Sequence, residues 1–269
     1  MRFMTQRMPA LFLGHGSPMN AITDTPERRN WVALGQVLPR PKAILVVSAH
    51  WENQGTIHLT TGEFPRTIHD FSGFHPDLYK VLYPAPGAPD LIERVTQLLG
   101  EAQVHRDDSW GFDHGSWGVL YPMLPKADVP MIQLGLNRSL SPQQHLAMAS
   151  ALAPLREEGV LLVSSGNVVH NLPEYFKTMG TKPDWAVEFQ DRITAAVQAD
   201  NHAALTEFAP DDRAAALAIN SGEHYLPLLY TVGARLPGDE VGVFNHAIDG
   251  AMSMTSYLIG DTGLLKTLH

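Results

Sequence analysis

The stretch Leu11-Phe12-Leu13-Gly14-His15-Gly16-Ser17-Pro18 joins a short apolar run to a polar cluster bracketed by two glycines. An apolar run of this length, ended by Gly-His-Gly, is typical of a buried β-strand that stops in a tight turn. The glycines allow a sharp bend and leave the imidazole uncrowded. The stretch therefore predicts a strand that presents His15 at its carboxyl end.

The same arrangement recurs along the chain. Three further apolar runs end at or close to a histidine, in residues 43–50, 160–170 and 241–246. In an open α/β sheet, ligands bind beyond the carboxyl ends of the strands. Imidazole is also the commonest metal-ligating side chain. Several histidines that arrive at the same end of a sheet therefore predict one metal site.

The segments between these strands have the signals of helices. Thr25 and Pro26 suit the N-cap and first position of a helix, and Ser141 opens a capping box with Gln144. A further core strand is expected at 130–136, and a helix over 184–199 has apolar residues at helical spacing. No repeat or linker divides the chain. We expect one α/β domain over residues 1–269, with a central, mostly parallel sheet flanked by helices and the metal site at the carboxyl ends of the strands.

Two segments rich in glycine, proline and aromatic residues are expected to form long loops. Residues 51–89 contain a short strand at 57–61, and residues 107–118 surround His114 before a helix at 119–124. Loops this long are usually functional or disordered, and their aromatic content argues against disorder. The aromatic residues of the first segment are either a wall over the site or a satellite hydrophobic cluster; they are Phe71, Phe74, Tyr79 and Tyr83.

The amino-acid composition limits the possible metal ligands and binding partners. None of the 269 residues is cysteine, so a metal must be held by nitrogen and oxygen, and no thiol nucleophile or disulfide exists. The net charge of -9 argues against nucleic acid as a partner. Residues 1–7 lack the apolar core of a signal peptide, and no apolar run is long enough to span a membrane. We expect a cytoplasmic protein; the sequence leaves its oligomeric state open.

The histidines are numerous enough for a catalytic metal centre, which needs about three protein ligands and an open position. The candidates are His15, His50, His170 and His224, with His114 and His246 behind them. Since neighbouring residues on a helix point in different directions, only one of Glu223 and His224 is expected to reach the metal. Glu223 would complete the two-histidine, one-carboxylate set of non-haem iron sites, whereas His224 would give three nitrogens, which zinc also accepts.

Six motifs resemble the DODA-type class III extradiol ring-cleavage dioxygenases, in the right order and over nearly the whole chain. They are Gly14-His15-Gly16-Ser17-Pro18, Ser48-Ala49-His50-Trp51, Tyr83-Pro84-Ala85-Pro86-Gly87, Trp110-Gly111-Phe112-Asp113-His114-Gly115-Ser116-Trp117, Ser164-Ser165-Gly166-Asn167-Val168-Val169-His170-Asn171-Leu172 and Glu223-His224-Tyr225-Leu226-Pro227-Leu228.

The resemblance implies a non-haem Fe(II), a catechol substrate and O₂, with ring opening beside the two hydroxyls. It implies that His15 and His50 are metal ligands and that His224 takes the third place, with Glu223 as the alternative. His170 corresponds to the acid/base histidine of the family and His114 to a substrate-contacting one. The resemblance also allows Zn(II) in the site, with His170 as a fourth ligand.

Two other functions are alternatives. A metal-independent or zinc-dependent hydrolase on an α/β scaffold would carry its nucleophile in G-x-S-x-G. Ser116 comes near this pattern, but His114 stands where the first glycine is required. A non-enzymatic metal-binding protein is the second alternative, and the pair His114 and His170 favours an enzyme. His246 is expected either beside the site or in a core hydrogen bond. The remaining histidines are expected to be ordinary surface or loop residues; they are His58, His69, His75, His105, His145, His202 and His269.

Overall fold

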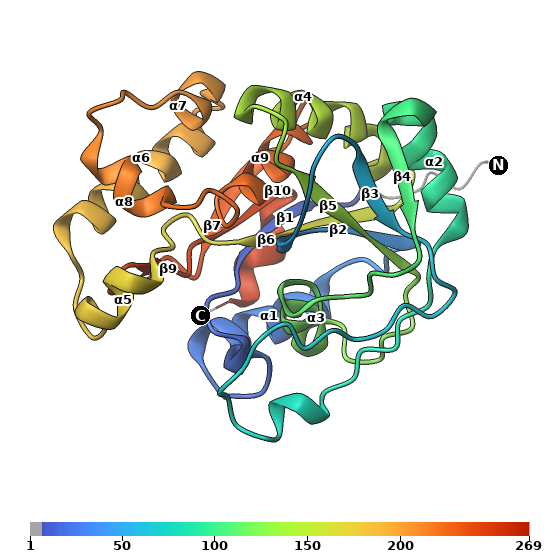
Figure 1. Ribbon diagram of the computed structural model, residues 1–269, viewed down its shortest axis with the longest axis horizontal. Helices are drawn as coiled ribbons and strands as arrows, with labels where there is room; N and C mark the ends of the chain where they lie inside the picture. The colour runs from blue at the N-terminus through green and yellow to red at the C-terminus, as the bar shows by residue number, and fades with distance from the viewer. Residues whose placement is uncertain (1–6, 269) are drawn as a thin grey trace.

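The computed structural model describes residues 7–268 and is built on an eight-stranded sheet with helices packed on both faces (Figure 1). The strands of this sheet are β1 (Ala10–Gly14), β2 (Ala43–Asn53), β3 (Ile57–Thr60), β4 (Val104–Asp107), β5 (Met131–Asn137), β6 (Val160–Gly166), β7 (Glu240–Phe244) and β10 (Ser256–Gly260). Two short strands, β8 (Ile248–Asp249) and β9 (Met252–Ser253), pair separately.

The strand order is β4-β3-β5-β2-β6-β1-β10-β7. The four central strands, β5, β2, β6 and β1, are parallel, whereas β10 runs antiparallel to β1 and β3 antiparallel to β5. The predicted α/β domain with a central, mostly parallel sheet is therefore confirmed. β1 and β2, the first two strands along the chain, run parallel but are not neighbours, because β6 lies between them.

Apolar residues on both faces of the central strands explain why the sheet lies between two layers of helices. In β1, Leu11 and Leu13 join one hydrophobic cluster and Phe12 joins the other. In β2, Val46 joins the cluster of Leu11 and Leu13, and Val47 joins the cluster of Phe12. Strands that are apolar at every position are typical of a parallel sheet covered on both faces.

The helices are α1 (Pro26–Val37), α2 (Pro89–Leu99), α3 (His114–Met123), α4 (Pro142–Leu152), α5 (Leu172–Thr178), α6 (Asp184–Gln198), α7 (His202–Thr206), α8 (Arg213–Ile219) and α9 (Leu226–Gly233). α1 and α3 supply one hydrophobic cluster, and α2, α4, α6 and α9 supply the other. The predicted helix starts are confirmed: Thr25 Oγ1 accepts a hydrogen bond from the Arg28 amide, and Ser141 and Gln144 form the capping box.

Two local predictions were wrong. β2 does not stop at His50 but runs on to Asn53, although its pairing with β6 ends at Ser48 and its pairing with β5 is irregular from Val47 to Glu52. His114 lies in a helix rather than a loop, since α3 begins at this residue with Asp113 as its N-cap. Within residues 7–268, no helix is long and apolar enough to cross a membrane.

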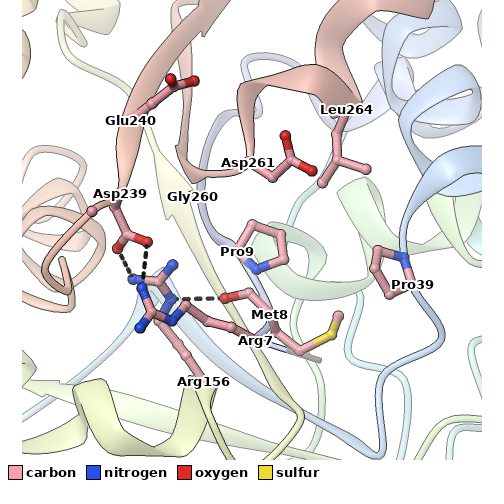
Figure 2. Close-up of a pocket in the computed structure, with 11 residues that line it drawn as sticks. Arg7, Met8, Pro9, Pro39, Arg156, Asp239, Glu240, Gly260, Asp261 and Leu264 are labelled. Atoms are coloured by element: carbon pink, nitrogen blue, oxygen red, sulfur yellow. Dashed lines mark hydrogen bonds and ion pairs between the residues drawn. The ribbon is translucent and has the colours of Figure 1, made fainter. Parts of the chain in front are cut away.

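A pocket of about 330 Å³ lies at the opposite end of the sheet from the histidines, between Pro9, Gly260 and Asp239 (Figure 2). Its central group is the fully buried Arg156, which donates hydrogen bonds to three backbone carbonyls and to the Asp239 carboxylate, 2.5 Å away. A buried charge is tolerated when it is paired and fully hydrogen-bonded. The charges of Arg156 and Asp239 are therefore paired, and Arg156 ties the segment before β1 to the end of β10.

Candidate metal centre

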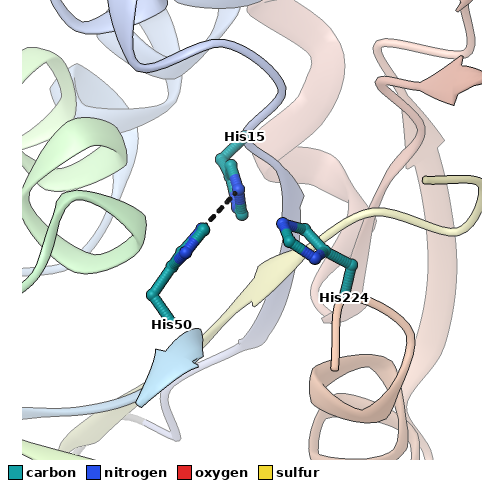
Figure 3. A group of neighbouring side chains, drawn as sticks. All are labelled: His15, His50 and His224. Atoms are coloured by element: carbon teal, nitrogen blue, oxygen red, sulfur yellow. Dashed lines mark hydrogen bonds between the residues drawn. The ribbon is translucent and has the colours of Figure 1, made fainter. Parts of the chain in front are cut away.

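Three histidines from distant parts of the chain converge at the carboxyl end of the sheet (Figure 3). His15 directly follows β1, His50 lies in β2 and His224 lies in the turn before α9. Each ring offers one nitrogen, and the three nitrogens lie within 4.8 Å of one another. His15 and His224 are buried, and His50 is only partly exposed.

The spacing of these nitrogens fits a metal ion. The Nε2 atoms of His15 and His50 are 3.1 Å apart. Two imidazole nitrogens bound to one ion at ~2.0–2.1 Å, about 90–110° apart, are separated by roughly 3 Å. The arrangement matches a pair of nitrogen ligands on one ion, and His224 supplies a third donor.

The other ring nitrogens have partners that fix the rings. His15 Nδ1 is hydrogen-bonded to Ser165 Oγ at 3.0 Å, and His224 Nδ1 donates to a Glu223 carboxylate oxygen at 2.9 Å. Metal-ligating histidines usually hold such a partner, which sets the tautomer and the ring orientation. Glu223 therefore contacts the nitrogen of His224 that is turned away from the three-histidine group.

A glycine lets the turn of His224 approach the end of β6. A Cβ at Gly166 would lie 2.2 Å from the His224 carbonyl oxygen, which is closer than any side chain permits. The same carbonyl accepts a hydrogen bond from the Asn167 amide at 2.8 Å. The close contact between these two backbones brings His224 to the strand end beside His15.

His114 and His170 lie against two of the three histidines, His114 beside His50 and His170 beside His224. The ring of His114 lies 3.9 Å from the ring of His50, measured between centroids, and the ring of His170 stacks on that of His224. The backbone of His170 is held by a hydrogen bond from its amide to the Ala218 carbonyl. Five of the six candidate histidines are thus brought together, and His246 lies elsewhere.

The sequence reasoning missed Asp70, which lies in the loop between β3 and α2. One carboxylate oxygen accepts a hydrogen bond from the His114 amide at 2.9 Å, and the other lies 3.0 Å from His114 Nδ1 and 3.7 Å from His50 Nδ1. Burial opposes ionisation of Asp70, but the hydrogen bond and charge of His114 outweigh it and lower its pKa. The only sequence signal is an acidic residue next to Phe71, whose ring meets that of His114.

A second missed residue is Asp113, fully buried beneath His50. It accepts hydrogen bonds from Ser48 Oγ at 2.7 Å and from the Gln133 amide group, and Ser48 Oγ in turn accepts from the His50 amide. Burial, followed by the nearby Asp70 charge, raises the pKa of Asp113. The network fixes the part of β2 that carries His50.

Burial keeps the central imidazoles neutral. It is the largest cause that lowers the pKa of His15 and of His224, and the neighbouring histidines add to it. Burial and then His114 lower the pKa of His50 to about 3, and burial lowers that of His170 to about 4. Neutral imidazole is the form that binds a metal or accepts a proton.

Residues 9–254 match the family described as the catalytic LigB subunit of aromatic ring-opening dioxygenase. The chain belongs to this family. The matched residues include all five histidines of the site, so the LigB family assignment confirms the predicted resemblance to extradiol dioxygenases. A LigB-family chain of this kind is an enzyme, an oxidoreductase that opens aromatic rings.

Relatives of this chain are similar to it over nearly its whole length. A "4,5-DOPA dioxygenase extradiol" of Escherichia coli (strain K12) is 46% identical over 94% of this chain and 95% of its own, and one of Beta vulgaris is 34% identical over 93% and 96%. The crystal structure of an uncharacterized protein of Escherichia coli K12 is similar with a TM-score of 0.79 and 42% identity, covering 94% of this chain and 100% of that one.

The other histidines lie apart from the LigB site. His246 follows β7, at the far edge of the sheet, and its Nε2 lies near Gln190 and Asp191. The expectation for His145 was wrong, because it lies fully buried in α4 with Nδ1 hydrogen-bonded to Tyr230. His58 and His105 lie in strands β3 and β4. His69, His75 and His202 have partly or fully exposed side chains, and His269 is outside the described residues.

Proposed function

We propose that this LigB-family enzyme uses O₂ to open the ring of a catechol such as DOPA beside its two hydroxyls. The observation that carries the proposal is the group of three histidine nitrogens, 4.8 Å or less apart, with two further histidines beside it. The name shared by the Escherichia coli and Beta vulgaris relatives supports DOPA as the first substrate to try.

The proposed metal ligands are His15, His50 and His224. Fe(II) is the metal expected for activity, and Zn(II) is the alternative occupant, with His170 as a possible fourth ligand. When bound, a non-haem Fe(II) supplies positive charge that favours a deprotonated catechol and the redox chemistry needed with O₂. Three neutral imidazoles leave such a site more positive than a set with a carboxylate, which suits a substrate that gives up protons. Glu223 then orients His224 rather than binding the metal itself.

His170 is proposed as the acid/base residue. Burial lowers its pKa to about 4, so the ring is unprotonated at neutral pH. Its proposed part is to take a proton from a catechol hydroxyl and to return one during ring opening. Its place on the ring of His224 keeps it within reach of a substrate bound at the three-histidine group. A correctly placed group of this kind contributes ~10²–10⁴ in rate.

His114 is proposed to contact the substrate from the other side. Asp70 holds its backbone amide and faces its Nδ1, which leaves Nε2 as the nitrogen for the substrate. Phe71 packs edge-on against His114 and against Phe74, so part of the aromatic segment borders the site as one of the two interpretations expects. Tyr83 is instead buried, and its hydroxyl donates to the Leu124 carbonyl.

The test combines metal analysis with O₂ consumption over a panel of catechols. The proposal expects one equivalent of metal at the three histidines, uptake of O₂ with DOPA and a ring-opened product. Loading with Fe(II) and with Zn(II) in parallel decides which ion supports turnover. Hydrolysis of an ester or amide without O₂ uptake would instead support the zinc hydrolase. The cytoplasmic location stays a prediction.

A further inference from the structure

His58, His105 and Asp107 form a second group of metal-ligating side chains, at the edge of the sheet formed by β3 and β4. One ligand atom from each lies within 4.8 Å of the others. We propose that these three side chains bind a second divalent transition-metal ion, separate from the LigB centre. The inference does not depend on the proposed function, because it uses none of the residues of that site.

The backbone places the three side chains on one face. β3 and β4 are parallel, and their register pairs His58 with His105 and Thr60 with Asp107. Since alternate residues of a strand share a face, His58, His105 and Asp107 all point to the same side. The intervening Leu59 points into the core on the other side. The ring centroids of the two histidines are 4.5 Å apart.

The donor atoms have the spacing that one ion requires. His58 Nδ1 lies 3.1 Å from Asp107 Oδ2. Ligand atoms bound to zinc at ~2.0–2.2 Å with angles of about 90–110° lie roughly 3 Å apart. The distance equals that between the two Nε2 atoms of His15 and His50 in the LigB centre.

Hydrogen bonds orient the Asp107 carboxylate so that one oxygen can bind an ion. Its Oδ1 accepts hydrogen bonds from the Ser109 amide and hydroxyl and from the Trp110 amide, which leaves Oδ2 to face His58. Burial alone would raise the pKa of Asp107, but the hydrogen bonds from Ser109 and His58 lower it to about 2. The carboxylate is therefore charged and oriented before any ion arrives.

The site is open to solvent on one side. His105 is exposed, whereas His58 is partly covered and meets the edge of Trp51 at 5.9 Å. Two imidazoles and one carboxylate, with free positions for water, suit Zn(II) and similar ions. Elsewhere, His202 has only Asp200 as a nearby partner in the described residues, so it lacks a third donor and provides a control.

An ion bound at this second site would hold in place the turn from Asp107 to Trp110, which leads to the LigB centre. Asp107 ends β4 and organises the turn through Trp110, and Trp110 stacks on Trp51, the residue after His50. Tying Asp107 to His58 and His105 would fix the edge strands and the start of this segment. The expected role is stabilisation, because an ion that binds the folded chain raises its melting temperature.

The experiment counts Zn(II) bound by the chelator-stripped enzyme in equilibrium dialysis. We expect the His105→Ala variant to bind one equivalent fewer than the parent, and the His202→Ala variant to bind as many as the parent. The same comparison in a His50→Ala background, where the LigB centre is disabled, should again show the loss of one equivalent. Zn(II) should raise the melting temperature of His50→Ala but not of His50→Ala/His105→Ala.

Equal zinc content in the parent and His105→Ala, in either background, overturns the second site. The His58→Gln variant provides an independent check, because it keeps a polar group of similar size and should lose the same equivalent. Failure of the LigB centre to bind metal gives a different pattern, in which His50→Ala matches the parent while His105→Ala still loses its equivalent. The two proposals are therefore tested separately.

Discussion

The imidazole of His170 lies flat on that of His224, with ring centroids 3.4 Å apart and 6° between the ring planes. One of these residues is a proposed metal ligand and the other the proposed acid/base group. Burial lowers the pKa of both, so two positively charged rings in contact are avoided at neutral pH. The stacking fixes the acid/base residue relative to the metal centre.

Replacing His15 or His50 by alanine should remove most of the metal bound at the three-histidine group, because one of three ligands is lost from a site whose geometry is already set. Circular dichroism should show that the fold is retained. The matched control is His202→Ala, which changes an exposed histidine on α7. Full metal content in His15→Ala or His50→Ala would show that the ligand assignment is wrong.

Variants of Glu223 and His224 should differ in how much metal binding they lose. His224→Ala should empty the site, whereas Glu223→Gln should weaken metal binding by ~10–100-fold, the usual effect of removing a partner that orients a ligand. Metal affinity measured by competition with a chelator separates the two. An empty site in Glu223→Gln together with a filled one in His224→Ala would make the carboxylate the ligand.

His170→Gln should keep its metal and its affinity for catechol but consume O₂ ~10²–10⁴-fold more slowly, because the group that moves the proton is gone. Stopped-flow binding and O₂ uptake measure the two properties separately. A loss of metal in proportion to the loss of activity would instead identify His170 as a fourth ligand and shift the acid/base role to His114.

Asp70→Asn should retain metal and lower kcat/KM for catechol by ~10–100-fold, since a hydrogen bond to a charged group is worth about 1.5–3 kcal/mol. The amide keeps the shape of Asp70 but loses the charge that faces His114 Nδ1. The control is Asp77→Asn in the same loop, whose ion pairs within residues 7–268 are with His75 and Lys80. Identical kinetics in Asp70→Asn and the parent enzyme would exclude a positioning role.

His145 should make stability fall as the solution is acidified. Burial lowers its pKa in the folded chain to about 4, while the unfolded chain titrates near the ordinary value of 6.5. Between these values the unfolded chain binds the extra proton, so the free energy of unfolding decreases as pH falls through this window, by up to about 3 kcal/mol. Urea unfolding at pH 7 and pH 4.5 should show a smaller difference for His145→Gln than for the parent. Equal differences would mean that His145 is not held neutral by folding.

Elements with a local cause could be predicted from the sequence. The run 11–18 specified a strand, a glycine turn and a histidine at its end, because a continuous apolar run, chain bending and capping depend on near neighbours. The helix starts at Thr25 and Ser141 followed for the same reason. The sequence also determined that several histidines arrive at one end of the sheet, since parallel strands share their carboxyl ends.

Contacts between side chains from distant segments became visible only in the folded chain. Asp70 reaches His114 and His50 from a loop whose path depends on packing against α3, and no local pattern encodes that contact. His145 looked like a surface residue because its burial depends on α9 packing against α4. The residues alone left Glu223 and His224 open as the third ligand, and the family resemblance favoured His224 with Glu223 as the alternative. The contact between Gly166 and the His224 backbone, set by two segments 58 residues apart, turns His224 toward His15 and His50, because a side chain's direction follows from how its backbone is anchored.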